Sequence, residues 1–271
     1  MNSAFRLLST LLVSLPLTAA AVPQGSVDDP TYGTIRVGAG ASYFSTDTYL
    51  AGTTKRKWSN DLQQTGLHAT VGFQFLEDFG LDAKSGVFRI EAPIDAGGDS
   101  QGRLDTVVGV LWRPLKLGSL GFGLRGEAVL QGSYESGAAE APGLAANGGG
   151  GMVVVQGPVF PASPVSIDVG AGARAYGEGV PSEGVAWARA GLGLGATAIW
   201  AGYSHTQSLT GHDFNQPGDA RDIRRIVGLA ELSASLAILP TLQLNAGVAA
   251  TVVGRNKAEK IVVGAGAGFT F

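Results

Sequence analysis

The feature that most constrains the fold of this chain is a two-residue alternation of apolar positions with polar or glycine positions. In residues 67–75 the odd positions are apolar and the even positions are polar or glycine, and residues 263–271 repeat the pattern. Because successive side chains of a strand point to opposite faces, a period of two predicts β-strands with one apolar and one mixed face.

Twelve stretches show this alternation. They are residues 34–44, 66–76, 87–94, 103–113, 120–131, 148–156, 165–176, 186–194, 197–205, 224–236, 242–252 and 260–271. Longer polar connections are expected at 45–62, 95–102, 132–147, 177–184, 206–222 and 253–259, and shorter ones at 77–86, 114–119, 157–164, 194–196 and 237–241. Alternate short and long connections are typical of outer-membrane barrels, whose termini both lie in the periplasm. A merger of the two strands within 184–207, which would leave eleven, remains an alternative.

The composition favours a membrane barrel over a soluble one. Charged residues make up 15% of the chain, compared with about 25% in soluble domains. The predicted strands contain no apolar run of the roughly 20 residues that a membrane helix needs. In a bilayer, strands are stable only when closed into a barrel, because every backbone polar group needs a partner within the protein. We therefore expect an all-β, transmembrane, antiparallel up-and-down β-barrel of twelve strands over residues 33–271. A soluble barrel or sandwich would explain the alternation, but not strand charges gathered opposite an all-apolar face.

The first 21 residues resemble a cleaved signal peptide. They contain Arg6 as their only charge, an apolar region from Leu7 to Leu17, and the small residues Ala19 to Ala21 before the expected cleavage site. Residues 22–32 are mostly polar and are expected to be a periplasmic lead-in. Export of this kind predicts a location in the bacterial outer membrane.

Charge and cysteine content exclude several other classes. Without Arg6, 18 Lys and Arg remain against 22 Asp and Glu, a net charge of −4 that does not suit nucleic-acid binding. The chain has no cysteine, so it has neither disulfides nor cysteine-ligated metal sites. No cofactor is expected.

The mixed faces of the predicted strands carry nearly all of the strand charges. We expect the following side chains to line the lumen: Arg36, His68, Arg89, Glu91, Arg103, Asp105, Arg125, Glu127, Asp168, Arg174, Arg189, Arg225 and Glu231. Seven are basic and five acidic, which would give a channel a slight preference for anions. The other interpretation, favoured for most of them, is that they are structural ion pairs, because a buried arginine needs a carboxylate partner.

The sequence contains little that indicates a catalytic or a metal site. The only candidate cluster is His205 beside Ser204, with Asp213 and Asn215 in the following segment. An outer-membrane phospholipase would have Ser two residues after the His, and position 207 is Gln. Two neighbouring ligands, His212 and Asp213, are weak support for a metal site. We expect no catalytic, cofactor-binding or metal-binding residues.

The last predicted strand resembles that of a known class of proteins. The ending Gly264-Ala-Gly-Ala-Gly-Phe-Thr-Phe271 resembles the C-terminal strand of Gram-negative outer-membrane proteins. That resemblance implies that Phe271 is recognised by the barrel-assembly machinery. Outer-membrane lipid and lipopolysaccharide are further expected partners. The basic run Lys55-Arg56-Lys57 is compatible with contact to lipopolysaccharide phosphates, or with a simple solvated loop.

A second resemblance covers roughly residues 34–135. The run Gly102-Arg-Leu-Asp105-Thr-Val-Val-Gly-Val-Leu-Trp-Arg113-Pro, preceded by Phe79-Gly-Leu and Phe88-Arg-Ile-Glu91-Ala-Pro93, resembles outer-membrane proteins associated with aromatic meta-pathway degradation. Such proteins are implied to transport hydrophobic compounds. This sequence departs from their pattern with Leu104 in place of a second glycine, and with Leu130-Gln131-Gly132 in place of Pro-Thr-Gly.

These observations together predict an outer-membrane channel or transporter for passive passage of small solutes. The second resemblance points to apolar or aromatic solutes. One alternative is a structural or surface-interaction barrel, plugged by its own side chains and acting through its external loops. A lipid-active outer-membrane enzyme is a third.

Overall fold

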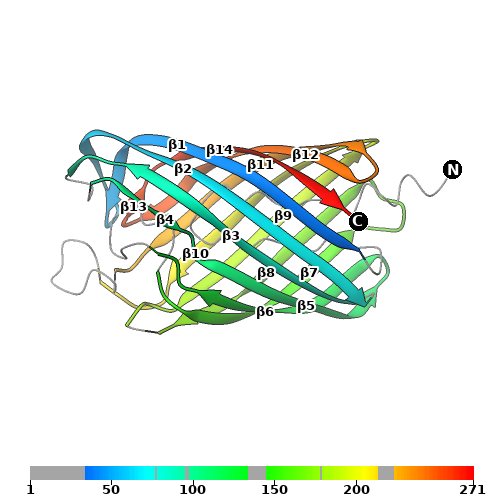
Figure 1. Ribbon diagram of the computed structural model, residues 1–271. Coiled ribbons are helices and arrows are strands. Elements are labelled where there is room, and N and C mark those ends of the chain that lie inside the picture. The colour runs from blue at the N-terminus through cyan, green and yellow to red at the C-terminus, as the bar shows by residue number, and fades with distance from the viewer. Residues whose placement is uncertain (1–33, 77, 95–97, 134–144, 178, 213–222) are drawn as a thin grey trace.

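The computed structural model describes residues 34–76, 78–94, 98–133, 145–177, 179–212 and 223–271 (Figure 1). The expected signal peptide 1–21 and lead-in 22–32 lie outside the described residues. Every named element is a β-strand, and no helix of the described part is long and apolar enough to cross a membrane.

The strands form one closed antiparallel barrel. They are β1 (Ile35–Ala51), β2 (Thr54–Leu76), β3 (Phe79–Glu91), β4 (Ser100–Arg103), β5 (Thr106–Leu117), β6 (Leu120–Leu130), β7 (Gly148–Pro158), β8 (Val165–Tyr176), β9 (Glu183–Leu194), β10 (Thr197–Ser208), β11 (Ile226–Leu239), β12 (Leu242–Arg255), β13 (Lys257–Ala258) and β14 (Ile261–Thr270). β1 pairs with both β2 and β14, which closes the sheet (Figure 1).

Two strands of the wall are interrupted. β4 and β5 both pair with β3 and are separated by Leu104 and Asp105, while β13 and β14 both pair with β1 and are separated by Glu259 and Lys260. Counted as wall strands, the described elements therefore make twelve, as the sequence predicted. The alternative of eleven is wrong, because Leu194 pairs with Thr197 across a tight turn at Gly195, whose φ is 67°. A glycine adopts such a positive φ without strain.

The prediction of a long loop at 45–62 is wrong, because most of these residues belong to β1 and β2. β1 and β2 remain paired to Ala51 and Thr54, with the turn at Gly52. β2 has 23 residues, roughly twice the 9–11 that a strand needs to cross a bilayer, so this hairpin projects beyond the membrane. At its outer end Lys57 forms an ion pair with Asp47, and this hydrogen bond lowers the pKa of the Asp47 carboxyl group.

The prediction of a connection at 77–86 is also wrong, because most of these residues belong to β3. β3 already begins at Phe79, so the polar residues Asp82 and Lys84 lie within a strand. They pair with Gly72 and Thr70 of β2. From the sequence, Asp82 and Lys84 were assigned to a turn because they are polar. They alternate with the apolar residues Leu81 and Ala83, however, and this period of two is the pattern of a strand.

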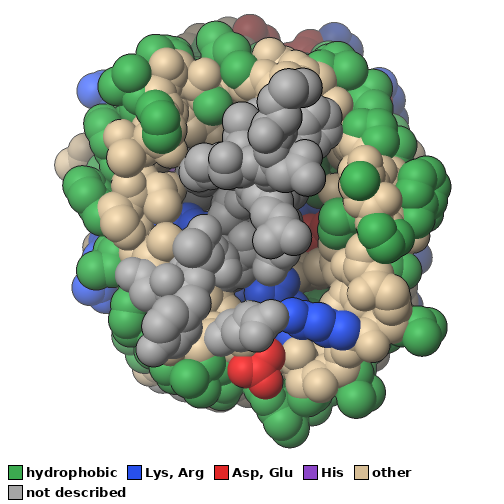
Figure 2. Space-filling model, turned by 90° about the vertical axis from the view of Figure 1, so that its right-hand side faces the viewer, with side chains coloured by type: hydrophobic (Ala, Val, Ile, Leu, Met, Phe, Trp, Pro, Cys, Tyr) green, Lys and Arg blue, Asp and Glu red, His purple; other side chains and the backbone are tan. Residues whose placement is uncertain are grey.

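The outer surface of the barrel is apolar. Leu67, Leu124 and Val153 are each more than half exposed, and similar residues recur on strands around the barrel. Figure 2 views the end of the barrel at which β14 ends, and hydrophobic side chains project around its rim. An exposed apolar surface of this kind is the lipid-facing band of a transmembrane barrel.

At the outer end of β1 to β3 the pattern of faces is reversed. Phe44, Trp58, Leu62, Phe88, Ile90, Ala249, Ala258 and Val262 form a buried apolar cluster there, which we call the outer core. Trp58 stacks on Tyr49 with 4.7 Å between ring centroids. The reversal follows because the projecting part of the barrel meets water on the outside, so apolar side chains turn inward as in a soluble protein.

The outer core makes Leu62 the most informative position for a stability test. Its side chain is 0% exposed, whereas Leu67 on the lipid-facing side of the same strand is 55% exposed. We expect Leu62→Ala to lower the free energy of unfolding by about 2–5 kcal/mol, because it leaves a cavity that the cluster cannot fill. Leu67→Ala, where lipid replaces the lost contacts, should cost clearly less. Urea unfolding of both variants in lipid vesicles measures the difference, and equal losses would contradict a packed outer core.

Candidate functional site

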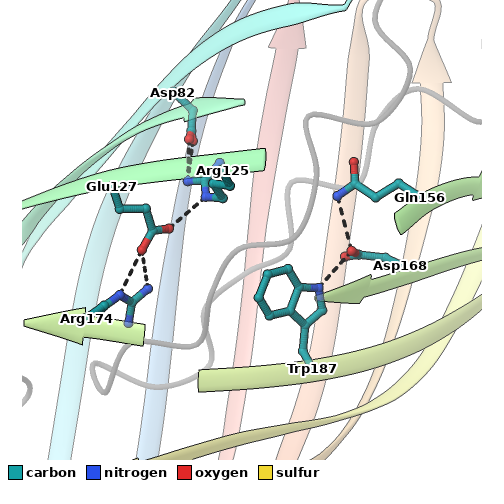
Figure 3. A network of polar contacts seen from close by, with 7 residues as sticks. All are labelled: Asp82, Arg125, Glu127, Gln156, Asp168, Arg174 and Trp187. Carbon is teal, nitrogen blue, oxygen red and sulfur yellow. Dashed lines mark hydrogen bonds and ion pairs between the residues drawn. The ribbon is translucent and has the colours of Figure 1, made fainter. Parts of the chain in front are cut away.

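Four charged side chains from three strands meet on the inner face of the barrel (Figure 3). Arg125 of β6 donates to both oxygens of Asp82 on β3, at 2.6 and 2.7 Å, and its Nε donates to Glu127 at 2.8 Å. Arg174 of β8 donates to the other oxygen of Glu127 at 2.8 and 2.5 Å. We call these four residues the first ion network. Two positive and two negative charges balance within it.

Glycines on the intervening strands make this network possible. In the sheet register Asp82 pairs with Gly109, Gly109 with Glu127, Glu127 with Gly150, and Gly150 with Arg174. A Cβ atom at position 109 would lie 2.2 Å from Nη2 of Arg125 and 2.5 Å from Oδ1 of Asp82. The long side chains therefore lie flat across glycine positions, which explains part of the 42 glycines of the chain.

A second ion network lies on the following strands. Asp168 of β8 accepts hydrogen bonds from Trp187 Nε1 at 2.8 Å and from Gln156 Nε2 at 3.2 Å (Figure 3). Arg189 of β9 lies 3.8 Å from Asp168 and 3.1 Å from Glu231 of β11. Asp168 is almost completely buried, and partners on both sides offset the cost of burying its charge.

An apolar cluster occupies the inner wall beside the two networks. It consists of Leu111, Met152, Val154, Val185 and Trp187. The ring of Trp187 lies over Gly170, where a Cβ atom would be 2.2 Å from it. The inner wall from β5 to β9 is thus filled by bulky side chains that are held in place by packing and ion pairs.

The structure places most, but not all, of the expected lumen residues on the inner side. Those buried or largely buried there are Arg36, His68, Arg125, Glu127, Asp168, Arg174, Arg189 and Glu231. Asp105 lies at the break between β4 and β5, where its carboxylate accepts the Gly132 N–H at 2.7 Å. Arg225 directly precedes β11, and its N–H is bonded to Ser208 Oγ.

Arg89, Glu91 and Arg103 were expected inside and lie on the outer face. Arg89 and Glu91 are exposed and pair with each other at 2.9 Å. Arg103 is exposed and pairs with Val87 in the register, on the same outer face. The reason is the reversal at the outer core, where Phe88 and Ile90 take the inward positions.

Sequence reasoning missed several charged residues of the inner wall, among them Asp82, Lys84 and Glu183. Asp82 and Lys84 fell in the segment interpreted as a turn, and Glu183 fell in the expected loop 177–184 but starts β9. Glu183 accepts a hydrogen bond from Tyr176 at 3.1 Å. The alternation of 81–85 was the signal that would have placed the first two.

The candidate catalytic pair does not form. Ser204 is buried and donates to Glu231 at 2.6 Å, whereas His205 contacts Tyr203 through Nδ1 at 3.0 Å. Consecutive residues of a strand point to opposite faces, so this Ser and His cannot act together. Asp213 and Asn215 lie outside the described residues. The described part of the chain contains no cluster of three metal-ligating side chains.

Comparison with known proteins gives similarity of structure only. No protein-family model matches the chain, and no curated protein sequence does. The chain is similar to the COG4313 outer membrane channel from Pseudomonas putida F1, with a TM-score of 0.71, 14% identity, and coverage of 93% of this chain and 99% of that one. It is also similar to the NanC porin (TM-score 0.54, 8% identity, 87% and 98% covered) and to a KdgM porin in complex with disordered oligogalacturonate (0.53, 10%, 88% and 99%). At these identities the likeness establishes the fold, a transmembrane barrel.

Gly109 allows a direct test of the first ion network. We expect Gly109→Ala to destabilise the barrel by about 1–3 kcal/mol, because the added methyl group overlaps the Arg125 guanidinium and forces it away from Asp82. Urea unfolding in lipid vesicles is the measurement.

Gly126 provides the matched control for this substitution. It adjoins Arg125 in β6, and a Cβ atom there would meet nothing within 4 Å. Gly126→Ala should therefore change the stability by less than about 0.5 kcal/mol. If the two variants lose the same stability, the close approach at Gly109 does not matter.

Proposed function

We propose that this protein is a channel of the bacterial outer membrane for passive passage of small solutes. The observation that carries the proposal is a closed barrel whose outer face is apolar and whose inner face holds a fixed set of charges in two ion networks. Lumen charges of fixed geometry are what select solutes in barrel channels. The similar solved structures, an outer membrane channel and two porins, support the same class of function.

The location and the assembly partner belong to this proposal. Phe271 is 72% exposed, and its N–H and C=O groups pair with Ile35 of β1 at the seam of the barrel. A terminal aromatic that remains accessible suits recognition by the barrel-assembly machinery. Lipopolysaccharide is a further proposed partner at the β1–β2 hairpin, where Lys55, Arg56 and Lys57 are exposed. Ion pairs of Lys55 with Glu259 and of Lys57 with Asp47 leave Arg56 as the most available of these charges for phosphate.

Passage of apolar or aromatic solutes is a narrower proposal. It rests on the resemblance to meta-pathway proteins, and the inner apolar cluster around Met152 and Trp187 offers such solutes a surface. A different observation supports the alternative of a plugged barrel. The outer core and the paired charges fill much of the described interior. Conductance distinguishes an open channel from a plugged barrel.

The deciding experiment is single-channel recording in planar bilayers with the protein purified from bacterial outer membranes. We expect steady conductance steps, and we expect Arg125→Ala to alter their size because it releases Asp82 and Glu127 into the lumen. A correctly folded barrel that passes no current would support the plugged alternative instead. A lipid-active enzyme would instead release fatty acid from vesicles.

A further inference from the structure

Lys84 is a basic residue of the inner wall that forms no ion pair with either ion network. It lies in β3, two residues from Asp82 and on the same face, and pairs with Thr70 of β2 and Val107 of β5. It is close enough to Glu127 and Arg174 for electrostatic interaction. Yet within the described part of the chain no carboxylate lies within ion-pair distance of its ammonium group, because both nearby carboxylates are occupied by Arg125 and Arg174.

His68 supplies a second polar group at the same place. It lies on β2, pairs with Gly86 of β3, and is only 7% exposed. Its Nε2 atom has no hydrogen-bond partner among the described residues, and His68 is near enough to Lys84 for electrostatic interaction. A buried ring nitrogen without a partner is costly, unless something in the lumen bonds to it.

The inward positions of the neighbouring wall are occupied by small residues. On β1 and β14 the inward positions that follow His68 around the barrel are small: Gly38 pairs with Gly268, Gly40 with Gly266, and Ser42 with Gly264. His68 itself pairs with Gly40. These small side chains contrast with the bulky ones on the wall from β5 to β9.

We propose that Lys84 and His68 form an anion-recognition site in the lumen, and that Lys84 gives the channel its preference for small monovalent anions, carboxylates included. An ammonium group attracts the anion, and a histidine N–H can donate a hydrogen bond to it. The two ion networks contribute less to selectivity, because their charges are paired with one another. Arg113 of β5 also has no ion pair in the described chain, but it lies near the end of β5 that adjoins the turn to β6. This inference rests on the proposed channel function.

The test is the reversal potential of the purified protein in planar bilayers under a potassium chloride gradient, and then under a potassium acetate gradient. We expect the wild-type channel to prefer the anion in both salts. Lys84→Gln should lower the anion-to-cation permeability ratio by about threefold or more, because one uncompensated charge in a confined lumen dominates the local potential. Lys84→Glu should reverse the preference, and Lys84→Arg should keep it. His68→Ala should weaken acetate permeation and leave the sign of the preference unchanged.

Controls separate this proposal from the channel function itself. Lys116→Gln removes the same charge from an exposed position near the end of β5 and should leave the permeability ratio unchanged. Lys84→Met serves as a second neutral variant if Lys84→Gln does not fold, as judged by heat-modified mobility in gels. A silent wild-type barrel would overturn both proposals. A conducting barrel whose ion preference survives Lys84→Gln or Lys84→Met would overturn only this one.

Discussion

Closure of the sheet through β1 is the constraint on which the rest of the structure depends. β1 pairs along most of its length with β2 on one side and with β14 on the other, and Ile35 exchanges two backbone hydrogen bonds with Phe271 at the seam. Without this closure two edges of backbone groups would face lipid, where no water can satisfy them. Closure also explains the period of two in the sequence, since a closed sheet has one side that faces lipid and one that faces the lumen.

The closed wall creates a packing problem that glycine solves. Inward side chains of twelve strands cannot all be large, and charged ones must also reach partners on other strands. Placing Gly109 and Gly150 between Asp82, Glu127 and Arg174 lets these side chains lie along the wall and meet. Trp187 over Gly170 and Arg189 over Gly202 use the same arrangement. The distribution of glycine thereby decides where the large inward side chains can lie.

The medium outside the wall decides which face is apolar. Within the membrane the lipid-facing residues are apolar and the lumen holds the charges, whereas around the outer core Phe88 and Ile90 turn inward and Arg89 and Glu91 face outward. Both arrangements place apolar side chains away from water. A single strand, β3, contains both, with Asp82 and Lys84 inside near one end and Phe88 inside near the other.

The sequence by itself determined the barrel and its twelve strands, because alternation is local information and closure follows from the lack of alternative partners in a bilayer. It did not determine where the strands leave the membrane, so Arg89, Glu91 and Arg103 were assigned to the wrong face and β1, β2 and β3 were predicted too short. Only the tertiary structure decided which charges meet. Asp82 and Arg125 are 43 residues apart and Glu127 and Arg174 are 47 apart, and their contact depends on the register between strands and on the glycines between them. For the same reason only the fold shows that Lys84 has no ion-pair partner among the residues that the structure describes.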